Sequence, residues 1–298
     1  MRQRTVKKEY SFEGIGLHSG IHTGVCIKPA SPDTGIRFLR KDLGVEIPAL
    51  AQNVVSTARS TILGVGEVVV GTVEHVLSAL TGLGVDNALI EVTGAEMPIL
   101  DGSASFYVRA ICADGLQEQD AERKYLSISE PLTVEDPKSG SRVEITPADH
   151  PSIDVEVDFG SKVLGVQKAH WDETVDYASE IAPCRTFCFF HELEQLLSLG
   201  LVKGGDVDNA IVVVENPVSA ERFEQVRKLF TTSDVAEKNG YLNNLELHFP
   251  NECGRHKLLD IIGDMRLAGG YLNARVYAYK PGHGINTAAA LAAQEKLF

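Results

Sequence analysis

The residues of this sequence whose types and spacing could do chemistry are histidines and carboxylates. His256 and Asp260 are four positions apart in RHKLLDIIGDM, His75 follows Glu74 in TVEHVLSAL, and His283 stands between two glycines in PGHG. Residues at i and i+4 share one face of a helix, so His256 and Asp260 can reach the same ion. Two imidazoles and a carboxylate leave a divalent ion one open position for water, and Glu74 is placed where a general base could act on that water. The pattern predicts a zinc hydrolase.

Neither pair is specific by itself, because a histidine on an amphipathic helix is more often a core or surface residue. Together they indicate more, since both lie in helical sequence, at about 72–83 and 255–268, that is followed by a strand. Sliding the sequence by 181 positions superposes three pairs: His75 on His256, Leu77 on Leu258 and Gly82 on Gly263. This repeat predicts two similar halves that share a cleft and hold one metal ion between them.

The elements that must position these residues occur twice in the same order. In the first part, glycine-punctuated strands precede the helix, and a strand, a second helix and an apparent linker at 117–124 follow. In the second part, four strands between 124 and 159 and a mixed segment precede the helix, and the strand YLNARVYAY, the turn PGHG and a closing helix follow. We predict an α+β fold of two similar domains, each a sheet packed on a helix layer, with the helices facing each other across the active-site cleft. The predicted domains are residues 1–121 and 122–298.

The segment of about residues 183–215 carries more apolar side chains than one docking helix needs. Its main part reads RTFCFFHELEQLLSLGLVKGGDVDNAIVV. Core packing explains most of them. A sharper hypothesis is that a few line an elongated pocket for a lipid-like tail, because each buried methylene contributes roughly 0.8 kcal/mol.

Composition limits the class of protein. The net charge of −13 over 298 residues disfavours nucleic-acid binding, and no apolar run reaches the ~18–20 residues of a membrane span. Five scattered cysteines and the lack of a signal-like N-terminus favour the cytoplasm. An anionic substrate would need local positive charge, for which the candidates are the metal, Lys257, Arg185 and Lys280.

An ordered set of motifs resembles one family. GIGLHSG, TVEHVLSAL, DNALIEV, PILDGSA, CRTFCF, KGGDVDNAIV, RHKLLDIIGDM and PGHGINT resemble the zinc-dependent UDP-3-O-acyl-N-acetylglucosamine deacetylases of lipid A biosynthesis, over essentially the whole chain. The resemblance implies two similar α+β domains whose small insertions form a substrate groove and an acyl passage. In some relatives such a chain continues into an acyl-carrier-protein dehydratase domain, so this chain is either the deacetylase alone or part of a fusion.

The resemblance also implies residue roles. His75, His256 and Asp260 match the zinc ligands, with Fe²⁺ as a possible alternative ion, and Glu74 matches the general base. His283 matches the acid that protonates the leaving amine, with Asp264 as its partner. Lys257 matches a lysine beside the metal and Thr186 a hydroxyl near the scissile carbonyl. The expected substrate-binding residues are Phe187, Phe190, Leu193, Val202, Ala210, Leu17 and Ile62.

Two other functions fit the same ligand set. Non-haem iron oxygenases also use two histidines and a carboxylate, but they need neither Glu74 nor an acid histidine. A protein that binds a sugar nucleotide or an acyl chain around a structural metal, without catalysis, is the second alternative. Acetate release from a UDP-acylglucosamine separates the hydrolase from both.

Overall fold

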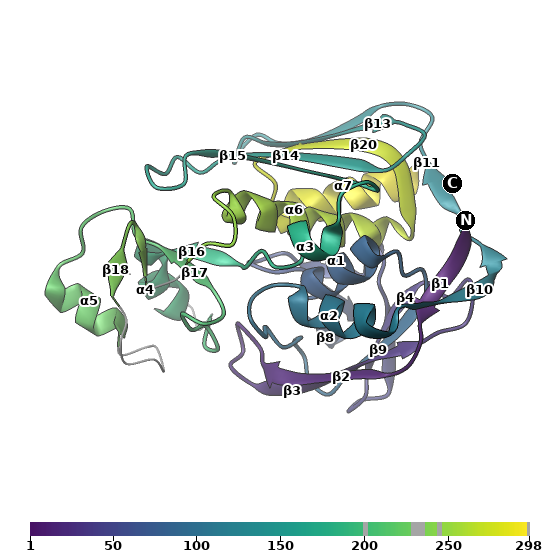
Figure 1. Cartoon of the computed structure of the whole chain (residues 1–298), viewed down its shortest axis with the longest axis horizontal. Coiled ribbons are helices and arrows are strands. Elements are labelled where there is room, and N and C mark those ends of the chain that lie inside the picture. The colour runs from purple at the N-terminus through teal and green to yellow at the C-terminus, as the bar shows by residue number, and fades with distance from the viewer. Residues whose placement is uncertain (199–201, 228–235, 243–245, 297–298) are drawn as a thin grey trace.

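The computed structural model arranges the chain in four layers (Figure 1). One sheet lies at the top, the helices α6, α7 and α3 lie beneath it, α1 and α2 form the next layer, and a second sheet lies at the bottom. A smaller lobe projects from one end of this body, and both termini lie at the other end. The structure describes residues 1–198, 202–227, 236–242 and 246–296.

The first half of the chain forms the lower sheet, which has the strand order β2-β3-β9-β4-β5. Neighbouring strands are antiparallel, except that β9 and β4 are parallel. The elements of this half are β1 (Arg2–Val6), β2 (Tyr10–Ile15), β3 (His22–Pro29), β4 (Ile36–Arg40), β5 (Val45–Pro48), η1 (Ala51–Asn53), β6 (Val54–Ser56), β7 (Ile62–Val65), β8 (Val68–Val70), α1 (Glu74–Leu83), β9 (Ala88–Val92), α2 (Ser105–Asp114) and β10 (Leu116–Glu122).

The second half repeats this topology in the upper sheet, whose main order is β12-β13-β20-β14-β15. Here too the central pair, β20 and β14, is parallel, and the flanking pairs are antiparallel. The elements are β11 (Tyr125–Ser127), β12 (Leu132–Asp136), β13 (Ser141–Pro147), β14 (Ser152–Asp158), β15 (Val166–Asp172), α3 (Tyr177–Glu180), β16 (Phe187–Phe189), α4 (Phe190–Ser198), β17 (Ile211–Val213), α5 (Ala220–Arg227), β18 (Glu237–Lys238), β19 (Tyr241–Leu242), α6 (Glu252–Met265), η2 (Arg266–Ala268), β20 (Tyr271–Tyr279) and α7 (His283–Glu295).

The matching strand orders confirm the predicted α+β class with two similar sheets. α1 and α6 occupy equivalent places, each before a central strand of its sheet. They pack on each other in the middle of the molecule, where Leu77 and Leu258 are fully buried. Our division of the chain between residues 121 and 122 falls at the end of β10 and stays a prediction.

Several element boundaries differ from the prediction. The stretch taken for a linker is the strand β10, which pairs with β1 in a two-stranded ribbon. Its side chains gave no strand signal because most are polar and all are exposed or only partly buried. Edge strand β15 was missed for a similar reason, since it alternates polar residues with few buried ones such as Trp171. α6 begins at Glu252, earlier than expected, and α7 begins at His283, within the predicted turn.

Each half carries a small additional sheet. In the first half this is β6-β7-β8, and in the second it is β16-β17-β19-β18, which forms the lobe of Figure 1. The predicted insertion at 183–215 is therefore too short, because β17 pairs with β19 at Tyr241. Of the predicted range, residues 199–201 lie outside the described part of the chain. Among the described residues, no helix is both long and apolar enough to cross a membrane.

Candidate active site

Three side chains that are distant in sequence meet where α1 packs on α6. His75 lies on the first turn of α1, while His256 and Asp260 lie one turn apart on α6. One potential ligand atom from each lies within 4.8 Å of those of the others. Asp260 Oδ1 is 3.3 Å from His256 Nε2 and 3.9 Å from His75 Nε2. The structure thus brings together the residues that the sequence predicts as metal ligands.

The donor set fits a divalent cation. Asp260 Oδ1 is buried and accepts no hydrogen bond in the described part of the chain, which leaves a carboxylate oxygen free for an ion. Burial lowers the pKa of His75 to about 3 and also lowers the pKa of His256, so both imidazoles are neutral and can donate a lone pair. Although burial opposes it, His256 and Lys257 keep the pKa of Asp260 far below its ordinary value. Two neutral imidazoles and one carboxylate suit zinc or ferrous iron.

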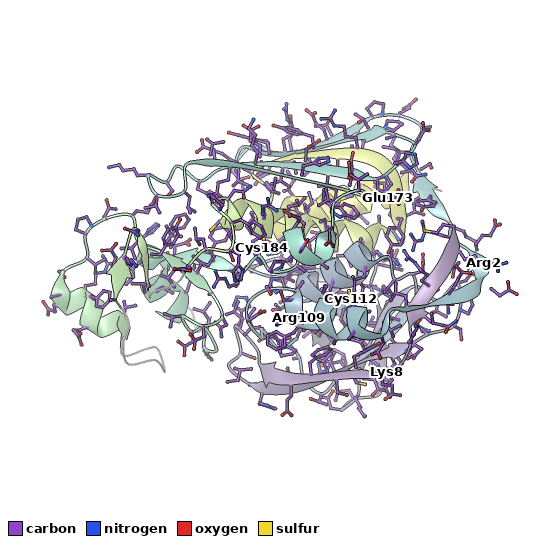
Figure 2. All side chains as sticks on the ribbon, viewed as in Figure 1. Arg2, Lys8, Arg109, Cys112, Glu173 and Cys184 are labelled. Carbon is purple, nitrogen blue, oxygen red and sulfur yellow. The ribbon has the colours of Figure 1, made fainter. Side chains whose placement is uncertain are left out.

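Backbone and side-chain contacts orient these candidate ligands. His256 Nδ1 is 3.0 Å from the carbonyl oxygen of Cys184, so a proton on Nδ1 leaves Nε2 free to face Asp260. Cys184 lies at the entrance to the lobe, next to α6 (Figure 2). The next residue, Arg185, donates from Nε to the buried carboxylate of Glu252 at 2.8 Å, which ties this segment to the start of α6. Lys257 Nζ donates to Asp260 Oδ2 at 2.7 Å.

Glu74 and His283 face each other beside the three ligands. His283 Nε2 is 3.9 Å from Glu74 Oε1, and the backbone N–H of Thr61 donates to Glu74 Oε2 at 3.0 Å. Burial raises the pKa of Glu74 to about 7, against the opposing effect of His283. Burial alone would lower the pKa of His283, but the charges of Glu74 and Asp264 outweigh it and raise that pKa to about 9. At neutral pH the pair can therefore both accept and donate a proton.

Asp264 holds the imidazole of His283 from behind. Asp264 Oδ2 is 3.1 Å from His283 Nδ1 and accepts a hydrogen bond from Asn286 Nδ2 at 2.9 Å. Its other oxygen accepts one from Thr61 Oγ1 at 2.6 Å. Neither Thr61 nor Asn286 was predicted from the sequence. The spacing of three between His283 and Asn286 was a usable signal only if the helix began at His283, as it does in α7, and nothing local links Thr61 to Asp264.

The three candidate ligands line a polar cavity together with Glu74 and His283, and we call it the metal cavity. Thr186 and Lys257, both predicted to act near the reacting carbonyl, lie in its wall. The full lining consists of Leu17, Arg59, Thr72, Glu74, His75, Thr186, Phe187, His256, Lys257, Asp260 and His283.

A second, mostly apolar cavity, which we call the passage, runs from there into the lobe. Four residues line both cavities, namely Leu17, Arg59, Thr186 and Phe187. Five residues predicted to bind substrate line the passage, namely Leu17, Phe187, Leu193, Val202 and Ala210. Its remaining lining residues are His18, Arg59, Thr186, Cys188, Leu196, Lys203, Gly205, Asp206 and Val212.

Two predicted substrate-binding residues line neither cavity. Phe190 is 4% exposed and packs in the core of the lobe, against a cluster that includes Val214 and Leu242. Ile62 lies on β7 with its side chain toward Gly71. Their roles in substrate binding stay predictions, because sequence position alone does not show which side of a thin insertion or strand faces a cavity.

The positive charge at the site also differs from expectation. Arg185 is paired with Glu252, and Lys280 lies 3.9 Å from Asp158, and neither residue lines the two cavities. Arg59 and Lys203 line the passage instead, and Arg59 Nη2 is 3.0 Å from Glu192 Oε1 on α4. Lys257 is the one predicted cation that lies in the metal cavity.

Comparison with known proteins gives a consistent picture. The model of the family described as LpxC, UDP-3-O-acyl N-acetylglycosamine deacetylase, matches residues 3–227 and 229–294. The chain is 42% identical over 294 residues to a UDP-3-O-acyl-N-acetylglucosamine deacetylase of Saccharophagus degradans, covering 96% of this chain and 88% of the relative. It is also 42% identical over 288 residues to a bifunctional enzyme LpxC/FabZ of Porphyromonas gingivalis. That match covers 96% of this chain but 62% of the relative, so the chain spans less than two thirds of the bifunctional protein.

Proposed function

The chain belongs to the UDP-3-O-acyl N-acetylglycosamine deacetylase family, and from this we propose that it hydrolyses the acetamide of UDP-3-O-acyl-N-acetylglucosamine. The products are UDP-3-O-acyl-glucosamine and acetate, in lipid A biosynthesis. The observation that supports this best is the meeting of three ligand side chains with the proton-exchanging pair Glu74 and His283 in one buried cavity. Burial also raises the pKa of the Glu74 carboxyl to about 7, and such shifts are concentrated at catalytic sites.

Zinc is the proposed cofactor, with ferrous iron as the alternative, and His75, His256 and Asp260 would hold it. When bound, such an ion supplies Lewis acidity, which makes water more acidic and an amide carbonyl more electrophilic. Asp260 contributes the charge, and the Cys184 carbonyl and Lys257 hold His256 and Asp260 in place.

Glu74 and His283 would move the protons of the reaction. Glu74 takes a proton from the water whose oxygen forms a bond to the acetamide carbon. Thr186 and Lys257 stabilise the negative charge that develops on the carbonyl oxygen, because fixed donors in a buried cavity are most effective there. When the carbon–nitrogen bond breaks, the imidazolium of His283 donates a proton to the leaving nitrogen, which becomes the free amine of the sugar. Asp264 keeps His283 charged for this step.

The two connected cavities suggest how the substrate would bind. The acetamide enters the metal cavity, and the 3-O-acyl chain follows the passage between Leu17 and Phe187 into the lobe. Lys257, Arg59 and Lys203 offset the long-range repulsion that a protein of net charge −13 exerts on a nucleotide diphosphate. Cytoplasmic location and fusion to a dehydratase domain stay predictions. All five cysteines are free in the structure, which is compatible with a reducing compartment.

The test is acetate release combined with metal analysis. Purified protein is stripped with a chelator, reloaded with Zn²⁺ or Fe²⁺ and incubated with UDP-3-O-acyl-N-acetylglucosamine. We expect one divalent ion per chain, loss of activity on stripping and its return with either ion. Bound metal without acetate from this substrate would favour a binding protein. Oxygen consumption that depends on iron would favour an oxygenase. Either result would contradict the proposed function.

A further inference from the structure

Glu96, outside the catalytic groups described above, is a buried carboxylate that contacts one residue of each cavity wall, His18 of the passage and Thr72 of the metal cavity. It is 8% exposed. The backbone N–H groups of His18 and Ser19 donate to its two oxygens, each at 2.8 Å, and the Thr72 hydroxyl donates to Oε1 at 3.1 Å. A buried carboxylate that accepts two backbone hydrogen bonds side by side fixes the position of that backbone strongly.

The backbone held in this way is a tight loop of residues 16–20, which we call the glycine loop. It closes on itself through the hydrogen bond from Gly20 N to Gly16 O at 3.0 Å. A Cβ at position 16 would lie 2.4 Å from Glu96 Oε2, so a larger residue there would displace the carboxylate or the loop. Leu17 and His18 of the loop line the passage, and Leu17 also lines the metal cavity.

The other side of the glycine loop rests on the lobe. Gly204 N donates to Leu17 O at 3.0 Å, and Lys203 N donates to His18 O at 3.4 Å. A Cβ at position 204 would lie 2.4 Å from Gly16 O, so the two backbones touch. The glycine loop is thus clamped between Glu96 of the first half and residues 203–205 of the second, and it forms the wall where the metal cavity opens into the passage.

We propose that Glu96 is a positioning residue for substrate binding: it holds the glycine loop as one wall of the passage, and so determines the affinity for the apolar chain of the substrate. This rests on the proposed function. The second carboxylate oxygen is essential to the arrangement. In Glu96→Gln, one acceptor becomes an N–H₂ donor that faces a backbone N–H, which breaks one hydrogen bond and repels the loop.

The experiment compares two substrates that differ only in the acyl group. UDP-3-O-acyl-N-acetylglucosamine with a saturated long-chain acyl group and the same compound with a 3-O-acetyl group are given to the metal-loaded wild type, Glu96→Gln and Glu67→Gln. Glu67 is an exposed residue in the turn between β7 and β8, so its variant is the matched control. For Glu96→Gln we expect KM for the long-chain substrate to rise about tenfold, with kcat, metal content and KM for the 3-O-acetyl substrate within about twofold of wild type.

A second variant, which disturbs the same contact by another route, keeps the test decisive if Glu96→Gln misfolds. Gly16→Ala keeps the glutamate at position 96 but introduces a Cβ that collides with its carboxylate. It should therefore produce the same selective rise in KM. Affinities of the metal-free proteins for both compounds, measured by calorimetry, should change in the same ratio without any turnover. A merely structural role would instead lower the melting temperature and leave the ratio of the two KM values unchanged.

The outcomes separate the two proposals. If the wild type releases no acetate from either compound, the proposed function fails. If the wild type is active and both variants keep the wild-type ratio of KM values, the role of Glu96 is refuted while the function stands.

Discussion

Gly263 of α6 lies directly against the backbone of Glu74 at the start of α1. A Cβ at position 263 would stand 2.1 Å from the carbonyl oxygen of Glu74 and 3.0 Å from the backbone nitrogen of Ser78. The close approach of the two helices is what allows the proposed ligand His75 on α1 to meet the proposed ligands on α6. In the equivalent place of the repeat, a Cβ at Gly82 would collide with the ring of Tyr177.

We therefore expect Gly263→Ala to weaken both the fold and the metal site. Overpacking in a buried contact costs about 1–3 kcal/mol of unfolding free energy, more than the ~1 kcal/mol that alanine gains in helix propensity. The displaced α1 should lower metal affinity, since His75 moves away from Asp260. Urea unfolding and competition with a chelator measure the two effects. Gly284→Ala is the control, because a Cβ there meets Thr57 at an ordinary 3.5 Å. Equal behaviour of the two variants would contradict the close-contact explanation.

Glu74→Gln and His283→Ala should separate proton transfer from metal binding. Neither residue belongs to the ligand trio, so metal content should stay at the wild-type level. We expect kcat to fall by roughly 10²–10⁴-fold in each variant, because each removes one proton-transfer group. Steady-state acetate release and elemental analysis on the same preparations are the measurements. Near wild-type turnover in either variant refutes the role assigned to that residue.

The pH dependence should reveal the support that Asp264 gives to His283. In the metal-free protein, the imidazole of His283 has a pKa raised to about 9, because the neighbouring carboxylates outweigh burial. A group whose pKa is higher when folded stabilises the fold while protonated. This contribution is complete below pH 6.5 and is lost as the pH rises through about 9. Asp264→Asn should shift the NMR titration midpoint of His283 to lower pH, and the alkaline limb of kcat/KM should move the same way. An unchanged midpoint would exclude Asp264 as the partner.

Filling the passage should discriminate between acyl chains. Ala210 lines the passage, so the indole of Ala210→Trp should occupy space that a long acyl chain needs. We expect KM for a long-chain substrate to rise about 10- to 100-fold while the 3-O-acetyl compound is hardly affected, since several methylenes lose their contacts. Phe190→Leu is the comparison, because Phe190 packs inside the lobe: it should cost stability without changing the preference for chain length. If both substrates suffer equally in Ala210→Trp, the passage does not hold the chain.

The sequence predicted the parts of the site whose geometry is local. His256 and Asp260 had to share a face of any helix through them, and the apolar periodicity around 72–83 and 255–268 located α1 and α6 to within a few residues. The internal match at an offset of 181 positions indicated that two equivalent helices would meet. The identical strand orders of the two sheets explain that signal, because both halves build the same scaffold around their main helix.

Contacts between distant segments could not be predicted from the sequence. Thr61 reaches Asp264 across 203 positions, and Glu96 reaches the glycine loop across 77 and 78. Nothing in the local patterns around these residues requires a partner, since hydrogen bonding between distant segments is fixed only when the sheets and helices have packed.

The amino-acid sequence by itself thus indicated which residues of this protein are the candidates for binding a metal and exchanging protons, because side-chain chemistry and helical spacing do not depend on the rest of the chain. The tertiary structure alone decided which apolar residues face the passage, as the contrast between Phe190 and Leu193 shows. It also decided the protonation of Glu74 and His283, since burial and the surrounding charges set their pKa values and exist only in the folded molecule.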